Sequence, residues 1–94
     1  MPRKVRLLRS AHREVDRLPG HLRQRARRLI DTLASTPRSS AAKGLRDMPN
    51  AYRLRLNGWR IIYVVDDDTQ VVWVVAVRLK TGAETYDDLP EIDD

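Results

Sequence analysis

The chain has 94 residues, 41% of them hydrophobic, so it can bury one small core but has no room for two. It contains no cysteine, which excludes disulfides and thiolate metal clusters and suits a reducing cytoplasm. The net charge is +5, and no apolar run approaches the roughly 20 residues of a membrane-spanning helix, so we expect one cytoplasmic domain (residues 1–94) without membrane contacts.

The basic residues are concentrated in the first half of the chain. Residues 1–46 carry 13 lysines and arginines against three acidic residues, whereas residues 47–94 carry five against ten. Such a basic segment attracts polyanions over long distances, although arginine-rich helices are also common simply because they stay hydrated. The acidic tail, residues 87–94, either screens this basic surface or frays.

The first 18 residues predict a strand followed by a short helix. Residues 3–8 form the strand, with Val5 and Leu7 on one side. Ser10 is then expected to cap the N-terminus of a helix that continues through residue 18. The apolar residues of this helix recur at helical spacing and form one stripe: Ala11, Val15 and Leu18.

A longer helix is predicted from about residue 21 to residue 35. Pro19-Gly20 separates it from the first helix, and Pro37 ends it. Its apolar side consists of Leu22, Ala26, Leu29, Ile30 and Leu33. Its other sides carry Arg23, Arg25, Arg27 and Arg28. Because the break is short, we expect a helical hairpin whose apolar stripes need a sheet to cover them.

Residues 36–50 predict an irregular connection, which Leu45 and Met48 anchor against the core. Three strands follow, at about Ala51–Leu56, Trp59–Asp66 and residues 69–79. Asn57-Gly58 favours a tight hairpin between the first two, and residues 66–68 supply the second turn. The third strand is rich in β-branched residues, which favours a central position in the sheet.

This order of elements predicts an α+β fold, β-α-α-β-β-β, with a two-helix hairpin packed on one face of an antiparallel sheet. The opposite face of the sheet is then open to a ligand. Arg53 and Arg55 are two residues apart, so they project from the same side of their strand.

Further cations lie on or beside the neighbouring strands, and a tyrosine follows them. These residues are Arg60, Arg78, Lys80 and Tyr86. Cations and a tyrosine on one concave sheet face suit a phosphate backbone with an unstacked base.

Four segments of the chain form a recognisable series. They are Ser-Ala at 10–11, Lys-Gly-Leu-Arg-Asp-Met-Pro-Asn-Ala-Tyr-Arg-Leu-Arg-Leu at 43–56, Gly-Trp-Arg-Ile-Ile-Tyr at 58–63, and Tyr86. In this order and spacing they resemble the RelE/ParE toxin superfamily, and RelE-type toxins in particular. The resemblance covers nearly the whole chain and implies a RelE-like fold.

The resemblance implies the toxin of a type II toxin–antitoxin system, an endoribonuclease (mRNA interferase) that cuts mRNA in the A site of the ribosome. Such enzymes need no metal or other cofactor, because the ribose 2′-hydroxyl attacks the adjacent phosphate and leaves a 2′,3′-cyclic phosphate. The expected partners are a cognate antitoxin, mRNA and ribosomal RNA, and, for the toxin–antitoxin hetero-oligomer, its own operator DNA.

Two other functions are compatible with the same resemblance. The ParE branch shares the fold but poisons DNA gyrase, so the main alternative is a gyrase inhibitor without nuclease activity. The second is a catalytically silent module that acts only with its antitoxin as an autorepressor.

RelE-type sites use basic residues and a C-terminal tyrosine, and the resemblance places Arg53, Arg55, Arg60, Lys80 and Tyr86 at these positions. The catalytic candidates are Arg55, Arg60, Lys80 and Tyr86. The RNA-binding candidates are Arg53, Arg55, Arg78, Lys43 and Arg46. In these roles Arg60 holds the charged phosphate oxygens, Lys80 protonates the leaving 5′-oxygen, and Tyr86 stacks on a base.

RelE-type toxins typically have lysines where this chain has Arg53 and Arg55. Arginine does not lose its proton in proteins, so neither residue is expected to act as a general base. The base is then either Tyr86, activated by the surrounding cations, or absent.

Structural roles are the alternatives for these residues. They are a hydrated strand face for Arg53 and Arg55, an ion pair with the connection for Arg60, a strand end for Arg78, and a lid over the core for Tyr86. Trp59 and Trp73 are expected to pack in the core or on the sheet. His12, His21 and the aspartates at 66–68 are expected to lie on the surface, because their spacing does not suit the ligands of a metal ion.

Overall fold

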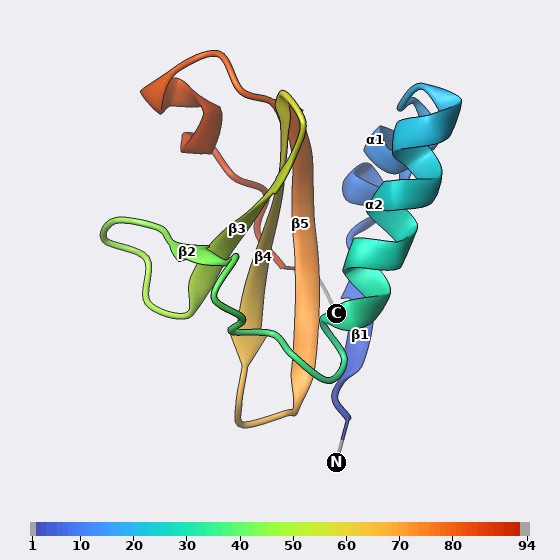
Figure 1. Cartoon of the computed structure of the whole chain (residues 1–94). Helices are drawn as coiled ribbons and strands as arrows, with labels where there is room; N and C mark the ends of the chain where they lie inside the picture. Colours follow the sequence, from blue (N-terminus) through green and yellow to red (C-terminus); the bar gives the residue numbers. More distant parts are fainter. Residues whose placement is uncertain (1, 93–94) are drawn as a thin grey trace.

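Within residues 2–92, five strands form one sheet, and two helices pack against one of its faces (Figure 1). The computed structural model describes residues 2–92, so residues 93 and 94 of the acidic tail lie outside it. The elements in chain order are β1 (Lys4–Leu7), α1 (Arg9–Asp16), α2 (Gly20–Thr32), β2 (Lys43–Gly44), β3 (Ala51–Leu56), β4 (Trp59–Asp66), β5 (Val71–Leu79) and a 3-10 helix, η1 (Ala83–Tyr86). The predicted α+β fold is confirmed.

The sheet has the strand order β1-β5-β4-β3-β2, with β1 and β5 parallel and the other pairs antiparallel. The predicted boundaries of β3 and β4 are confirmed. Asn57 has a φ of 53°, the left-handed conformation that a tight Asn-Gly hairpin turn requires. β5 begins at Val71 rather than residue 69. The carboxylate of Asp66 accepts hydrogen bonds from the N–H groups of Asp68 and Thr69, and these bonds extend the turn.

The connection between α2 and β3 contains a short strand that the sequence did not predict. β2 has two residues, and its register pairs Lys43 with Arg53 and Gly44 with Tyr52. A strand this short has no periodicity of its own, so only its pairing with β3 reveals it. Leu45 packs against the core as predicted, whereas Met48 is 37% exposed, so the prediction that it anchors the connection is wrong.

Both helices have boundaries that differ from the predicted ones. α1 starts at Arg9, which places Ser10 inside the helix, and no side chain in the described part of the chain caps its N-terminus. The predicted Ser10 cap is therefore wrong. The start of α1 is determined instead by the pairing of β1 with β5, which extends to the residue just before the helix. There the N–H of Leu8 donates to the carbonyl of Val74. α2 ends at Thr32, and the chain then turns through tighter hydrogen bonds.

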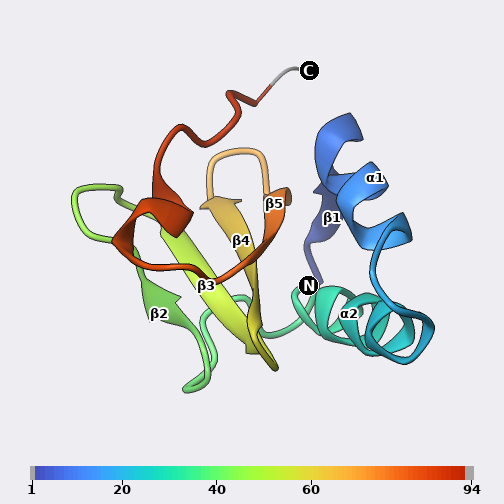
Figure 2. The same cartoon turned by 90° about the horizontal axis from the view of Figure 1, so that it is seen from above.

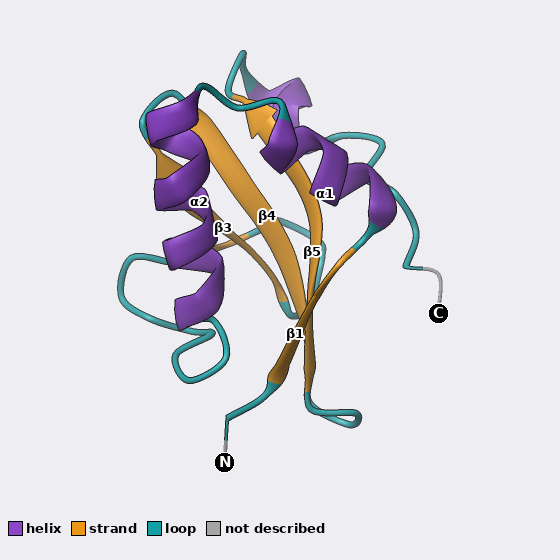
Figure 3. Ribbon diagram, turned by 90° about the vertical axis from the view of Figure 1, so that its right-hand side faces the viewer, coloured by secondary structure: helices purple, strands orange, loops and turns teal. Residues whose placement is uncertain are grey.

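Both helices lie over one face of the sheet (Figure 3), and their predicted apolar stripes belong to the hydrophobic core. The buried helical and inter-helical residues are Ala11, Val15, Leu18, Leu22, Ala26, Ile30 and Leu33. The sheet contributes Leu54, Leu56, Ile61, Tyr63, Val65, Val72, Val74 and Val77. Complete burial of one such Leu, Ile or Val side chain contributes about 1.5–3 kcal/mol. Between residues 2 and 92, no helix has the length and apolarity needed to span a bilayer.

β1 covers only the first part of the outer edge of β5. Its pairing ends at Leu7 and Val74, and Val75 has no partner in β4 because the register shifts there. Beyond this bulge the carboxylate of Glu14 accepts a hydrogen bond of 2.9 Å from the N–H of Val77. A side chain of α1 therefore satisfies a backbone donor that a strand would otherwise pair.

Candidate functional site

A row of three arginines crosses the uncovered face of the sheet. Arg55 of β3 lies directly opposite Arg60 of β4, which in turn lies opposite Arg78 of β5. Direct partners on neighbouring strands project from the same face. This face is the one away from the helices, because Leu54 and Leu56, which alternate with Arg55 along β3, are buried in the core.

A second pair of cations lies beside this row. Lys43 of β2 is directly opposite Arg53 of β3, and Arg53 shares its face with Arg55. Like charges placed opposite each other destabilise a sheet, so folding alone does not favour this arrangement. Cations contributed by four neighbouring strands to one uncovered face therefore indicate a binding site for a polyanion.

Tyr86 lies over the same face, because η1 sits on the side of the sheet opposite the helices (Figure 2). The centroid of its ring is 5.5 Å from the guanidinium carbon of Arg53, a cation–π contact. Its hydroxyl is buried and has no hydrogen-bond partner between residues 2 and 92. The ring also packs against the core, so Tyr86 is both a lid and a neighbour of the cations.

Arg60 is only 6% exposed, so its guanidinium is covered in this conformation. Nη1 donates to the carbonyl oxygens of Asn57 (3.1 Å) and Trp59 (2.8 Å), which ties the side chain to the β3–β4 hairpin. Nε is buried and has no partner in the described part of the chain. The alternative of an ion pair with the connection is wrong, since among residues 2–92 no acidic side chain lies within ion-pair distance of Arg60.

The guanidinium of Arg78 binds the C-terminal segment. Nη1 donates to the carbonyl oxygens of Thr85 (3.0 Å) and Asp87 (2.7 Å), and Nη2 donates to that of Asp88 (3.2 Å). The acidic tail is therefore held at its start rather than frayed. Any RNA contact of Arg78 has to compete with these bonds.

Four of the predicted residues remain exposed to solvent around this face. Their side chains make no hydrogen bond or ion pair within residues 2–92: Lys43, Arg46, Arg55 and Lys80. The N–H of Lys80 donates to the carbonyl of Gly58 (2.8 Å), so this lysine lies beside the β3–β4 turn that holds Arg60. Arg46 follows β2 in a turn, outside the strand ladder. The structure thus brings Lys80 toward the arginine row and leaves Arg46 at its margin.

An arginine that the sequence did not single out joins the connection to the start of β3 and to the β4–β5 turn. Arg38 donates to the hydroxyl of Tyr52 (2.8 Å), to the side chain of Asn50 (3.2 Å) and to Asp67 (2.8 Å). Hydrogen bonding to Arg38, reinforced by Arg3, lowers the pKa of Asp67. A single arginine in an irregular segment has no pattern, so no sequence signal could have identified this network.

The surface residues and packing residues are mostly where the sequence placed them. His12 and His21 are exposed, and Trp59 and Trp73 pack against the core. Between residues 2 and 92, no three His, Cys, Asp or Glu side chains come together as ligands of a metal ion.

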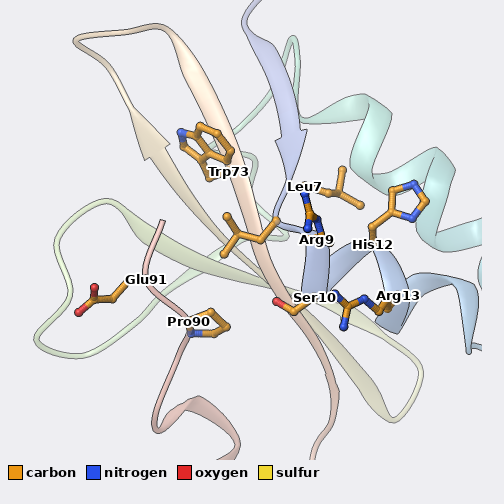
Figure 4. Close-up of a pocket in the computed structure, with 9 residues that line it drawn as sticks. Leu7, Arg9, Ser10, His12, Arg13, Trp73, Pro90 and Glu91 are labelled. Carbon is orange, nitrogen blue, oxygen red and sulfur yellow. The ribbon is translucent and has the colours of Figure 1, made fainter. Parts of the chain in front are cut away.

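An open cleft of about 830 Å³ lies at the β1 edge of the sheet (Figure 4). It is lined by Leu7, Leu8, Arg9, Ser10, His12, Arg13, Trp73, Pro90 and Glu91. None of the predicted site residues lines this cleft. We therefore place the candidate site on the uncovered sheet face, where the cations and Tyr86 converge.

Known proteins are similar in sequence to this chain over most of its length. Residues 5–81 match the family model of the ParE toxin of the type II toxin–antitoxin system parDE. The mRNA interferase toxin RelE of Escherichia coli (strain K12) is 32% identical over 78 residues, which cover 81% of each chain. The chain belongs to the RelE/ParE family of type II toxins.

Solved RelE structures share its fold. A substituted form of Escherichia coli RelE in the free state superposes with a TM-score of 0.76, at 30% identity over 92% of each chain. The toxin in the intact Escherichia coli RelBE complex is 34% identical, with a TM-score of 0.68 over 85% of this chain and 99% of that one. RelE-type toxins are therefore similar to this chain in both sequence and three-dimensional structure.

Proposed function

We propose that this toxin is a ribosome-dependent mRNA endonuclease. The observation that carries the proposal is the convergence of Arg53, Arg55, Arg60 and Tyr86 on one uncovered sheet face, with Lys80 beside it. The Escherichia coli and Shigella flexneri relatives that match 81% of the chain are named mRNA interferases, which supports cleavage of RNA.

The charges of the site suit cleavage by the substrate's own hydroxyl group. When the 2′-hydroxyl attacks the adjacent phosphorus, the bond to the 5′-oxygen breaks and negative charge builds on the non-bridging oxygens. Arg55 is exposed and can hold these oxygens. Lys80, also exposed, can donate a proton to the leaving 5′-oxygen.

Arg60 and Tyr86 need a change of conformation before they can act. Arg60 is covered, and the hydroxyl of Tyr86 is buried. Both become available to RNA when their side chains turn toward the substrate, while the bonds of Arg78 keep the backbone on either side of Tyr86 in place. Arg60 can then add a second guanidinium to the phosphate, and Tyr86 can stack on a base displaced from the codon.

The attacking hydroxyl group has to lose a proton, and few groups can accept it. Arg53 and Arg55 cannot, because arginine keeps its proton at any working pH. We propose that Tyr86 accepts this proton through its oxygen in the phenolate form and becomes a neutral phenol, because its ring lies next to the cation of Arg53.

A gyrase inhibitor without nuclease activity is the second candidate. One observation favours it, namely that the matching family model describes a ParE toxin. That model ends at residue 81, before Tyr86, so it covers the shared fold but not the complete candidate site. The mRNA endonuclease is therefore the function that the residues support better.

We also propose that a cognate antitoxin covers the cationic face. The Escherichia coli RelE toxin was solved in an intact complex with its antitoxin RelB. An extended acidic segment complements a face with cations on four strands, and the resulting hetero-oligomer is the form expected to bind operator DNA. Size-exclusion chromatography of the chain, alone and with the product of the neighbouring reading frame, tests this association.

Toe-printing on ribosomes that translate a defined mRNA tests the endonuclease proposal. We expect cuts within the A-site codon only when ribosomes are present, and a loss of about 100-fold or more in the double variant Arg60→Ala/Tyr86→Ala. His21→Ala, at an exposed position of α2, serves as the matched control and should cut normally. Absence of wild-type cleavage where Escherichia coli RelE cuts, together with trapped DNA–gyrase cleavage complexes, would establish the gyrase alternative.

A further inference from the structure

Arg78 differs from the other two arginines of the row, because its guanidinium binds the backbone of the C-terminal segment. By register it stands opposite Arg60 on the uncovered face. Its three hydrogen bonds go to the carbonyl oxygens of Thr85, Asp87 and Asp88, at 2.7 to 3.2 Å. A charged, forked donor that reaches three carbonyls fixes the direction of a chain segment more strongly than a single neutral hydrogen bond.

The segment between Arg78 and these carbonyls is itself well ordered by local hydrogen bonds. The hydroxyl of Thr85 is buried and accepts from the N–H groups of Thr81 (2.9 Å) and Gly82 (3.3 Å). Gly82 has a φ of 157° and lies close to the carboxylate of Glu84, where a Cβ would be 2.6 Å from an oxygen. The turn is therefore a compact unit, and Arg78 holds its far end to the sheet.

Tyr86 lies between the residues that Arg78 binds. The carbonyls of Thr85 and Asp87 flank it on either side, so the backbone of Tyr86 cannot shift along the sheet while both bonds to Nη1 persist. Its ring is then held 5.5 Å from the guanidinium carbon of Arg53.

From these contacts we infer that Arg78 is a positioning residue, which sets Tyr86 over the cationic face instead of binding RNA itself. The inference rests on the proposed function in so far as Tyr86 acts on RNA. Lysine at this position keeps the charge and three N–H donors, but it lacks the planar fork whose second nitrogen, Nη2, reaches the carbonyl of Asp88. The guanidinium shape, and not the charge, is what the position requires.

Steady-state cleavage on programmed ribosomes tests the role in catalysis. Arg78→Lys should lower kcat by about 10- to 100-fold, because a reacting group is displaced by about an ångström, and should leave KM nearly unchanged. Lys43→Gln is the comparator, since the loss of an exposed cation that only binds the RNA backbone should mainly raise KM. In a Tyr86→Ala background, Arg78→Lys should have no further effect, which separates positioning from general loss of structure.

A second measurement keeps the inference independent of activity. In the free toxin, nuclear Overhauser effects between the Tyr86 ring and the Arg53 side chain should be present. They should weaken several-fold in Arg78→Lys and Arg78→Gln and keep their intensity in Arg55→Gln, while the amide spectra of β3 and β4 stay native-like. If they keep their intensity in the Arg78 variants, or if Arg78→Lys behaves as wild type while Arg78→Gln only raises KM, Arg78 is a phosphate contact and the inference is wrong. A wild-type toxin that does not cut would overturn the proposed function alone.

Discussion

Tyr63 shows how one buried side chain joins the connection to the sheet. Its hydroxyl donates to the carbonyl of Pro37 at 2.6 Å, and its ring stacks on Tyr52 with 5.8 Å between centroids. Burial raises the pKa of Tyr63 to about 12, so the phenol stays neutral and keeps donating at physiological pH. The hydroxyl is a structural group, distinct from the phenol of Tyr86 on the other face of the sheet.

Tyr63→Phe should lower the free energy of unfolding by about 1–3 kcal/mol, because the carbonyl of Pro37 loses its buried donor. Urea unfolding at neutral pH measures this loss. Tyr52→Phe is the matched comparison, since the hydroxyl of Tyr52 meets Arg38 near the surface and its removal should cost less. Equal stability of Tyr63→Phe and wild type would show that the bond is not stabilising.

The raised pKa of Tyr63 also predicts a dependence on alkaline pH. The unfolded phenol ionises near its ordinary pKa of about 10, before the folded one does. The stability that the neutral phenol contributes is fully present below the ordinary pKa of tyrosine. It is lost as the pH rises through the higher pKa that Tyr63 has in the folded protein. Tyr63→Phe should lack this component of the alkaline fall.

Only part of the candidate site could be predicted residue by residue. Alternation along one strand placed Arg53 and Arg55 on the same face, and the burial pattern of β3 confirms it. The alignment of Arg55 with Arg60 and Arg78 depends on cross-strand register, which the turn and the bulge at Val75 determine. The bonds of Arg78 to the C-terminal carbonyls depend on an irregular segment that has no period to detect.

At the scale of elements, prediction succeeded where a local signal exists. Asn57-Gly58 fixed the end of β3 and the start of β4, and helical spacing identified the buried stripes of α1 and α2. Elements whose existence depends on distant partners were missed. β2 needs β3 beside it, and η1 needs the hydroxyl of Thr85 and the guanidinium of Arg78. The Ser10 cap failed for the same reason, since the pairing of β1 decides where α1 starts.

The β4–β5 turn is joined to two other segments through Asp67. Its carboxylate accepts from Arg38 of the connection (2.8 Å) and from Arg3 just before β1 (3.1 Å). Hydrogen bonding to Arg38, reinforced by Arg3, lowers the pKa of Asp67 in the folded protein. Its contribution to stability is therefore present above the ordinary pKa of aspartate, about 4, and is lost as the pH falls through the depressed value.

Asp67→Asn should flatten the fall of Tm on the acid side, below about pH 4, because the variant has no carboxylate to protonate there. Thermal unfolding followed by circular dichroism in a series of acidic buffers measures the slope. Asp68→Asn is the control in the same turn, since Asp68 forms no ion pair with residues 2–92. Parallel curves for Asp67→Asn and wild type would contradict the assignment.

The whole molecule presents basic residues on both of its layers. Its extents are only 33 × 28 × 28 Å, yet arginines lie on the outer side of α2 as well as on the uncovered sheet face. The helices and the uncovered sheet face lie on opposite sides of the molecule (Figure 1), so substitutions on each side can measure their contributions to the binding of a polyanion separately.

Binding of a short single-stranded RNA should separate the two layers. Arg55→Gln should reduce the slope of log K against log salt by about 0.7, the value for one lost phosphate contact. Arg28→Gln removes an exposed arginine from α2 and should leave the slope unchanged. Fluorescence anisotropy over a series of salt concentrations measures both. A reduced slope in Arg28→Gln but not in Arg55→Gln would place RNA on the helices.

The parallel pairing of β1 with β5 determines when the protein can fold during its synthesis. Val5 pairs with Val72, so the first strand has no partner until residues near 72 have been synthesised. The apolar stripes of α1 and α2 likewise meet β4 and β5 only at that stage, since the core needs residues such as Ile61 and Val74. Because such long-range contacts form late, the nascent chain cannot assemble the cationic face early in translation. A toxin directed at ribosomes therefore lacks its assembled cationic face until most of its chain has been synthesised.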